Sequence, residues 1–160
     1  MTALRAAVVV ASNRAAAGVY EDATGPLIIE ALRELGFAVD AAVVVPDGDP
    51  VAEAIAAAVE GGARVVLTTG GTGLTPTDLT PEATRPLLDR EVPGIAEAIR
   101  AHGVANGVPA AALSRGLAGV AGGCLVVNLP GSRGGVKDAI AVLRPVLVHA
   151  AEQVVGSDHR

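Results

Sequence analysis

Two glycine-rich segments, each following a run of apolar residues, combine exposed backbone amides with hydroxyl side chains. The first spans residues 69–73 (TGGTG) and the second spans residues 128–135 (NLPGSRGG). Glycine lets the backbone come close to a ligand, and successive amide groups form a concavity that binds anions. The hydroxyls of Thr69, Thr72 and Ser132 would add donors. Together the segments indicate a site for a ligand with more than one anionic group, although either segment could also be only a tight turn.

Neither segment matches a standard nucleotide or hydrolase signature. GGTGLTPTD lacks the Lys-Ser/Thr pair of a P-loop, and Pro76 stands where a dinucleotide fingerprint has its third glycine. PGSRG lacks the glycine that a nucleophile elbow places two residues before its serine. His102, His149 and His159 are not at metal-ligand spacing and are interpreted as surface or helix residues. Cys124 opens an apolar run, which predicts a core position.

Two carboxylates, Asp47 and Asp78, are the candidates for catalysis and metal binding. Asp78 lies between the first glycine segment and a proline-led helix, two residues before the predicted N-cap Thr80. A carboxylate would repel bound phosphates unless a magnesium ion lay between them, and Mg²⁺ takes one or two carboxylates plus substrate phosphates. Asp78 could instead be a turn residue that bonds its own backbone. Asp47 has no predicted structural task, whereas Asp49 is a predicted N-cap.

A third segment, residues 12–25, also follows a predicted strand. It contains Arg14, which could contact an anionic group, and Ser12 at its start. Asp22 or Thr24 is expected to cap the helix that follows.

The apolar pattern predicts the elements that would bring these segments together. Predicted strands cover residues 4–11, 39–45, 64–69 and 125–129, and predicted helices cover 24–35, 49–60, 81–90, 95–105 and, with a break at Pro145, 136–155. Residues 109–113 and 117–120 are expected to be short strands or a hairpin around Arg115-Gly116. This alternation predicts an α/β fold with a mostly parallel sheet and helices on both faces. Ligands bind at the carboxyl ends of such strands, so Asp47 and Asp78 are expected to converge there.

Length and composition narrow the class of protein. The 160 residues predict a single domain, residues 1–160. The net charge of −5 and the scarcity of aromatic residues, Tyr20 and Phe37, argue against a nucleic-acid partner. The apolar run at residues 6–11 is too short to cross a bilayer, so no membrane association is expected. One cysteine cannot form an internal disulfide, which favours a cytoplasmic location.

Five segments of the chain resemble the MogA/MoaB-like family of molybdenum cofactor biosynthesis proteins. In chain order they are SNRAAAGVYEDATG, PDGDP, TTGGTGLTPTDLTPEAT, EVPGIAEAIR and NLPGSRGGVKDAI. The resemblance runs from about residue 8 to residue 148 and implies a three-layer α/β/α sandwich. It implies molybdopterin adenylyltransferase activity, in which molybdopterin and Mg²⁺-ATP give adenylylated molybdopterin and pyrophosphate. Such a transfer depends on positioning and charge neutralisation more than on covalent participation of the protein.

The resemblance also implies roles for individual residues and partners. Asp78 matches the family's essential aspartate and Asp47 its second acidic position, which implies that both are catalytic and handle Mg²⁺. The implied substrate-binding residues are Ser12, Arg14, Thr69, Gly70, Gly71, Thr72, Gly73, Pro130, Gly131 and Ser132. A homotrimer, or a hexamer as in the MoaB branch, is implied, together with a MoeA-type molybdenum insertase as a partner. A non-catalytic molybdopterin-binding carrier or scaffold of the MoaB branch is the alternative.

Overall fold

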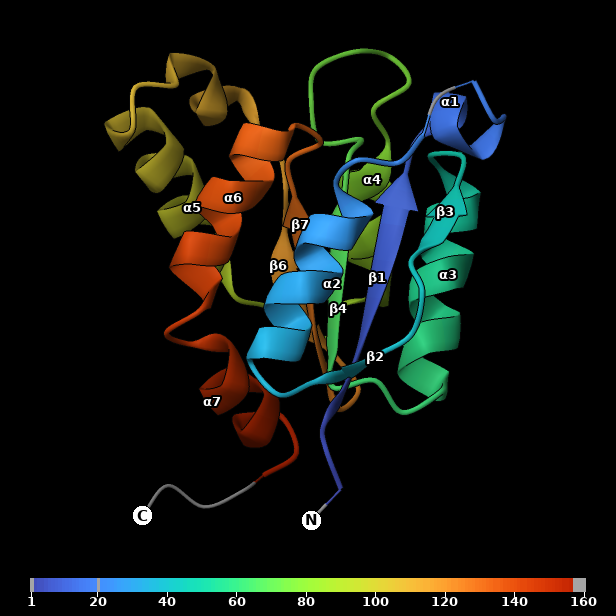
Figure 1. Ribbon diagram of the computed structural model, residues 1–160, viewed down its shortest axis with the longest axis vertical. Coiled ribbons are helices and arrows are strands. Elements are labelled where there is room, and N and C mark those ends of the chain that lie inside the picture. Colours follow the sequence, from blue (N-terminus) through green and yellow to red (C-terminus); the bar gives the residue numbers. More distant parts are fainter. Residues whose placement is uncertain (1, 20, 157–160) are drawn as a thin grey trace.

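The computed structural model describes residues 2–19 and 21–156, and a mixed sheet of seven strands lies at its centre (Figure 1). His159 lies outside the described residues. The sheet order is β2-β1-β4-β7-β6-β5, with β3 also paired to β1. The strands are β1 (Arg5–Ala11), β2 (Ala38–Val39), β3 (Val43–Val45), β4 (Val65–Thr69), β5 (Arg90–Glu91), β6 (Ala118–Ala121) and β7 (Cys124–Leu129).

The direction of the strands determines which loops meet. Strands β1, β2, β3, β4 and β7 are parallel, whereas β6 is antiparallel to β7 and β5 is antiparallel to β6. The carboxyl ends of β1, β3, β4 and β7 therefore share one edge with the amino end of β6. This is the upper edge of the sheet in Figure 1.

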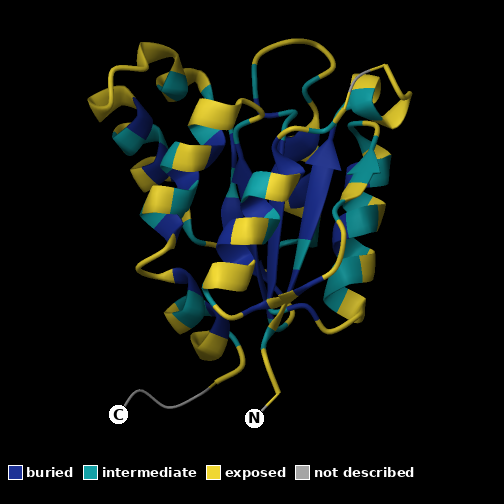
Figure 2. Cartoon of the chain, in the orientation of Figure 1, coloured by how far each residue is buried: buried dark blue, intermediate teal, exposed yellow. Residues whose placement is uncertain are grey.

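Helices cover both faces of the sheet and bury it. One face packs against α2 (Gly25–Glu34), α5 (Pro93–Ala105), α6 (Arg133–Leu143) and α7 (Leu147–Gln153), and the other against α3 (Asp49–Glu60) and α4 (Thr80–Thr84). Val8 and Val10 point to the first face and Val9 to the second, as strand alternation requires. Figure 2 shows the resulting buried sheet between half-exposed helices. The predicted three-layer α/β/α fold is confirmed.

Local sequence accounts for the ends and faces of these elements. In α2, Ile28, Ala31 and Leu32 are buried at helical spacing. Asp22 Oδ1 accepts the N–H groups of Thr24 at 3.1 Å and Gly25 at 3.0 Å, so of the two residues expected to cap α2, Asp22 supplies the hydrogen bonds and Thr24 makes no side-chain capping bond. Cys124 is buried as predicted, and this burial raises the pKa of its thiol to about 12. No helix among the described residues is both long and apolar enough to cross a membrane.

Two predicted elements along the first part of the chain are wrong in extent. The single strand predicted for residues 39–45 is two strands, β2 and β3, because the chain advances four residues from Val39 to Val43 while its partner β1 advances three, from Ala6 to Val9. The helix predicted for residues 81–90 ends at Thr84, since Pro86 has no N–H to continue it. A 3₁₀ turn, η1 (Arg85–Leu87), follows.

The region between α5 and β7 also departs from the prediction. Residues 109–113 form a 3₁₀ helix, η2 (Pro109–Leu113), where Pro109 occupies the first turn and alanines follow. The strand expected at residues 117–120 is present as β6, at residues 118–121, but the hairpin turn lies at Gly122-Gly123, between β6 and β7, rather than at Arg115-Gly116. The short elements α1 (Asn13–Ala16) and β5 were not predicted, because neither is long enough to show a period.

Candidate active site

The ends of β1, β4 and β7 meet backbone to backbone at the upper edge of the sheet. Gly70 and Gly71 follow β4 with φ values of 91° and 68°. A Cβ on Gly70 would overlap the carbonyl oxygen of Ala11, and a Cβ on Gly131 would lie 3.1 Å from Gly70 Cα. Gly70 has no room for a side chain, and a Cβ on Gly131 would require a small shift of Gly70, so these glycines allow the ends of the strands to approach each other closely.

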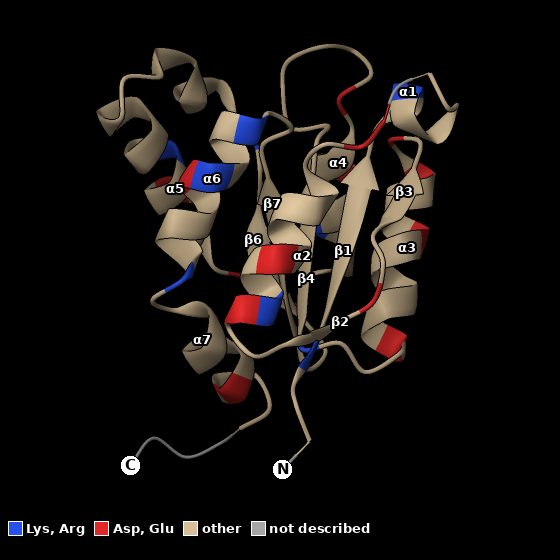
Figure 3. Cartoon of the chain, in the orientation of Figure 1, with Lys and Arg blue, Asp and Glu red and all other residues tan. Residues whose placement is uncertain are grey.

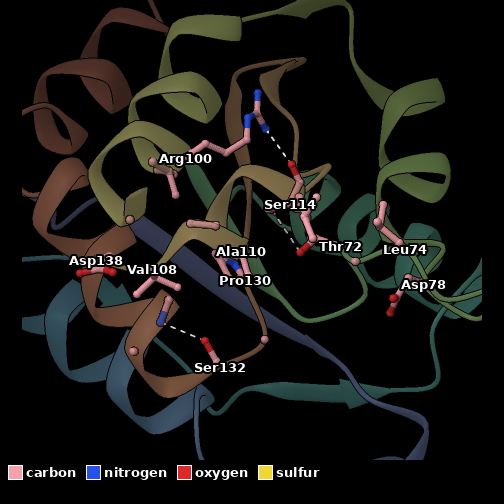
Figure 4. A pocket seen from close by; sticks show the side chains of 18 of the residues that line it. Thr72, Leu74, Asp78, Arg100, Val108, Ala110, Ser114, Pro130, Ser132 and Asp138 are labelled. Atoms are coloured by element: carbon pink, nitrogen blue, oxygen red, sulfur yellow. Dashed lines mark hydrogen bonds between the residues drawn. The ribbon is translucent and has the colours of Figure 1, made fainter. Parts of the chain in front are cut away.

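A cavity of about 560 Å³ opens beside these glycines (Figure 4). Its walls come from the loop after β4, the loop between β7 and α6, and the α5–η2 region. The polar residues include Thr72, Asp78, Arg100, Ser132 and Asp138, and Figure 4 shows Asp78 and Asp138 on opposite sides. The rest of the lining is mainly aliphatic, including Ile99, Val108 and Leu113. Such a lining suits a flat ring system held by a few polar contacts.

A second hollow of about 260 Å³ lies on the other side of the same glycine contact. Gly71 and Gly131 line both spaces. The predicted substrate-binding residues divide between them: the larger cavity has Thr72, Gly73, Pro130 and Ser132, and the smaller hollow has Ser12, Thr69 and Gly70. Arg14 and Asp47 line neither space.

Asp78 is half-buried on the wall of the larger cavity. Its Oδ2 accepts hydrogen bonds from the N–H of Thr75 at 3.0 Å and from the hydroxyl of Thr75 at 2.8 Å. Asp78 therefore closes a turn, which was the alternative interpretation of this residue. Its Oδ1 accepts no hydrogen bond from the described part of the chain. Asp78 therefore combines one anchored oxygen with one that a ligand could use.

Asp47 differs, because both of its oxygens are occupied. Oδ1 accepts the N–H of Gly48 and the hydroxyl of Thr80, each at 2.8 Å, and Oδ2 accepts the N–H of Leu79 at 3.0 Å. The N–H of Asp47 in turn donates to Asn13 Oδ1 at 3.0 Å. The prediction that Asp47 has no structural task is wrong, since this carboxylate joins the loop after β3 to the start of α4.

The two carboxylates nevertheless lie against the same glycine loop. A Cβ on Gly71 would overlap Asp47 Oδ2 and Thr80 Oγ1, and a Cβ on Gly73 would lie 2.7 Å from Asp78 Oδ2. The fold thus brings Asp47 and Asp78 from different strands to neighbouring points, and neither is sealed from solvent.

The hydroxyls of the loops mostly hold the protein together. Thr69 Oγ1 is buried and donates to the carbonyl of Pro130 at 2.7 Å, so it is not the ligand donor that the sequence suggested. Thr72 is buried and its hydroxyl accepts from Ser114 Oγ at 3.4 Å. Ser132 Oγ accepts the N–H of Gly135 at 3.0 Å and caps α6, while Ser12 caps α1. Thr72 and Ser132 act as acceptors in these hydrogen bonds, so their O–H groups can still donate to an anion, together with backbone amides of the loops.

The sequence analysis did not identify Arg115, whose side chain donates hydrogen bonds to backbone carbonyls of the glycine loop. Its Nε donates to the carbonyl of Gly73 at 2.9 Å, its Nη2 donates to the carbonyl of Asp78 at 2.8 Å, and its guanidinium pairs with Glu82. The hydrogen bond from Arg115 lowers the pKa of Glu82, and the same pairing raises the pKa of Arg115. An arginine placed before an antiparallel strand carries no local signal of this contact.

Charges of both signs lie near the upper edge of the molecule (Figure 3). Within the larger cavity, Arg100 donates to the carbonyls of Ser114 and Gly116 at 3.3 and 3.1 Å. Asp138 accepts from Asn106 Nδ2 at 3.2 Å. Among the described residues, no group of three or more His, Cys, Asp or Glu side chains is arranged to hold a metal. A cation here would need oxygens of a substrate as well.

Comparison with known proteins identifies the family. Residues 7–149 match the family model described as "Probable molybdopterin binding domain". The chain belongs to this family. The resemblance inferred from the five sequence segments is thereby confirmed.

Relatives and a solved structure agree with this membership. The chain is 40% identical over 159 residues to a molybdenum cofactor biosynthesis bifunctional protein of Chlorobaculum tepidum, covering 97% of this chain but only 50% of that protein. It is 38% identical over 146 residues to a molybdopterin adenylyltransferase of Pyrococcus furiosus, covering 89% of this chain and 86% of that protein. The structure of the molybdopterin biosynthesis Mog protein from Mycobacterium ulcerans superposes with a TM-score of 0.92 at 47% identity, covering 98% of this chain and all of that one, 100%.

Proposed function

We propose that this protein is a molybdopterin adenylyltransferase of molybdenum cofactor biosynthesis. Family membership and the name of the Pyrococcus furiosus relative support the reaction class. The observation that carries the proposal is the setting of Asp78. Asp78 lines the cavity that both glycine loops also line, and its Oδ1 accepts no hydrogen bond from the described residues.

The two loops supply the contacts that a phosphorylated substrate needs. The cavity is lined by residues 71–73 and by Gly131, Ser132 and Gly134, which carry backbone amides, and the amino end of α6 adds the positive end of a helix dipole. The aliphatic wall near Ile99 and Val108 accommodates a ring system. We therefore assign molybdopterin and ATP, as substrates, to the two spaces that Gly71 and Gly131 both line.

The residues fit a magnesium ion that is shared with substrate phosphates. Asp78 offers one carboxylate oxygen, and Mg²⁺ in phosphoryl-transfer sites needs only one or two carboxylates besides the phosphates. A bound Mg²⁺ would offset the negative charge that two phosphorylated substrates bring together.

The reaction itself is an in-line displacement. An oxygen of the terminal phosphate of molybdopterin attacks the α-phosphorus of ATP, the new P–O bond forms, and the bond from the α-phosphorus to the bridging oxygen breaks. The electron pair leaves with pyrophosphate. No covalent intermediate on the protein is required, so the chain acts by holding both phosphates in line and by excluding water from the cavity.

Asp47 has a supporting part in this proposal. Its carboxylate holds the Leu79 N–H and the Thr80 hydroxyl, and thereby fixes the backbone next to Asp78. A carboxylate has about four acceptor positions, so the three hydrogen bonds leave room for one further contact to a hydrated cation.

Pyrophosphate release tests the proposal. With molybdopterin, ATP and Mg²⁺, the wild-type protein should release pyrophosphate, and Asp78→Asn should lower the turnover rate by about 10²–10³-fold while molybdopterin still binds. Asp40→Asn is the matched control, because Asp40 is 93% exposed and pairs with Arg5 at 3.5 Å, away from the site. Normal turnover by Asp78→Asn would overturn the role of Asp78. Molybdopterin binding without pyrophosphate release by the wild type would indicate the non-catalytic carrier instead.

We further propose that the chain acts as a cytoplasmic homotrimer or hexamer and that a MoeA-type molybdenum insertase takes the adenylylated product. Light scattering would test the assembly, and a monomer at micromolar concentration would contradict it. Transfer of the labelled product to the insertase would test the partner.

A further inference from the structure

Arg115 contacts both ends of the exposed segment that carries Asp78. Its backbone N–H donates to the carbonyl of Thr72 at 2.8 Å, and its Nε donates to the carbonyl of Gly73 at 2.9 Å. Its Nη2 donates to the carbonyl of Asp78 at 2.8 Å. Residues 74–77, between these anchors, are exposed to solvent. One planar guanidinium therefore sets the separation between the two ends of this segment.

The remaining donors of Arg115 bind Glu82 in α4. Nη1 donates to Glu82 Oε1, and Nη2 also reaches Oε2 at 3.4 Å. Four of the five guanidinium N–H groups thus have acceptors within the protein. A guanidinium engaged in this way is not placed to bind a substrate phosphate.

The backbone on either side of Arg115 is held by a residue of α5. Arg100 in α5 donates to the carbonyls of Ser114 and Gly116, the residues on either side of Arg115. Ser114 Oγ donates to Thr72 Oγ1 at 3.4 Å. Two arginines therefore connect α5, the segment before β6, the glycine loop and α4 beside the cavity that Asp78 lines.

We propose that Arg115 is a positioning residue for the transfer reaction, which holds Asp78 at a fixed place relative to residues 71–73. The inference rests on the proposed adenylyltransferase function. Arginine is needed because its rigid fork can bind two carbonyls and a carboxylate in one plane, which the single ammonium group of lysine cannot do. Loss of the fork would leave the substrates bound but Asp78 misplaced.

The test compares Arg115→Lys and Glu82→Gln with the control Arg85→Lys. Arg85 pairs with Glu91 at 2.8 Å, also as an exposed arginine–glutamate pair close to α4, and among the described residues neither side chain forms a hydrogen bond or ion pair with the glycine loop. For Arg115→Lys we expect kcat to fall by about 10- to 100-fold, with the KM values for ATP and molybdopterin within about threefold of wild type. The Mg²⁺ concentration for half-maximal rate should rise, and Glu82→Gln should change in the same direction by a smaller factor.

Hydrogen exchange provides a readout that needs no turnover. The Thr75 amide donates to Asp78 Oδ2, so its exchange should accelerate at least about tenfold in Arg115→Lys and stay unchanged in Arg85→Lys. An unchanged exchange rate overturns the inference, as does a rise in KM for ATP with normal kcat, which would make Arg115 a substrate ligand. If the wild type releases no pyrophosphate, the proposed function fails, and exchange alone then decides whether Arg115 holds Asp78. If Arg115→Lys does not fold, Glu82→Gln decides by the same measurements.

Discussion

Asp47 and Asp78 are the same residue type at the same edge of the sheet, yet the fold uses them differently. Asp47 accepts hydrogen bonds on both oxygens, from Gly48, Leu79 and Thr80, and lines neither hollow at the glycine loops. Asp78 accepts on Oδ2 alone and lines the larger cavity. A carboxylate that backbone donors already satisfy contributes mainly to the shape of the site, whereas one with an oxygen left over can meet a ligand.

Substitutions at the two carboxylates should therefore have different effects, one on stability and the other on turnover. Substitutions around Asp47 should weaken the hydrogen bonds between the loop after β3 and the start of α4, and so lower the free energy of unfolding. Disturbing the Asp78 side should lower turnover with little effect on stability. The two glycines that touch these carboxylates, Gly71 and Gly73, allow each side to be changed separately.

Gly71→Ala should have the largest effect on stability. The new Cβ would overlap Asp47 Oδ2 and Thr80 Oγ1, and the φ of 68° is a conformation that alanine rarely adopts. We expect a loss of about 2–4 kcal/mol in the free energy of unfolding, measured by urea denaturation.

Gly73→Ala makes the same substitution next to the other carboxylate, Asp78. Its Cβ would lie 2.7 Å from Asp78 Oδ2, the end of a side chain that can rotate away. We expect less than about 1 kcal/mol of destabilisation and a fall in kcat of up to about 100-fold. If Gly73→Ala destabilised the protein as much as Gly71→Ala, the distinction between the two carboxylates would be lost.

Asp47→Asn should have an intermediate effect. The Asp47 carboxylate now accepts hydrogen bonds from Gly48, Leu79 and Thr80. The NH₂ group of the asparagine would face one of these donors, and that donor would lose its acceptor. We expect a loss of about 1–3 kcal/mol by urea denaturation, whereas Asp78→Asn should change stability by less than about 1 kcal/mol. Equal destabilisation by the two variants would contradict the division of roles.

Acidification should have the smallest effect through the Glu82–Arg115 pair on the Asp78 side. The pKa of Glu82 lies below its ordinary value of 4.5 because Arg115 donates to it, so the pair stabilises the loop above that pH. This contribution is lost as the pH falls through the lowered pKa and Glu82 becomes protonated. Both side chains are substantially exposed, at 35% for Arg115 and 55% for Glu82, so solvent screening keeps the effect on global stability small.

Nuclear magnetic resonance can follow this change directly. The Nε–H signal of Arg115 should shift as the pH falls below 4.5 and Glu82 becomes protonated in the wild type, whereas Glu82→Gln should show no such transition. A transition of the same size in Glu82→Gln would assign the effect to another carboxyl group.

The sequence alone was sufficient for the layers of the fold and for the edge at which the candidate site lies. Continuous apolar runs such as Val8–Val9–Val10 can satisfy burial on both faces only in a covered parallel sheet, and parallel strands place their carboxyl ends together. The resemblance in the five segments added the family, which the match over residues 7–149 confirms.

Only the tertiary structure decided what each side chain at that edge is free to do. The Asp47 carboxylate accepts a hydrogen bond from the backbone N–H of Leu79, 32 positions away. The backbone carbonyl of Asp78 accepts one from Arg115, 37 positions away. Arg115 reaches the site because β6 runs antiparallel and brings its amino end to the edge where β4 and β7 finish. Hydrogen bonds between such distant residues depend on strand direction and packing, which local spacing and periodicity do not encode.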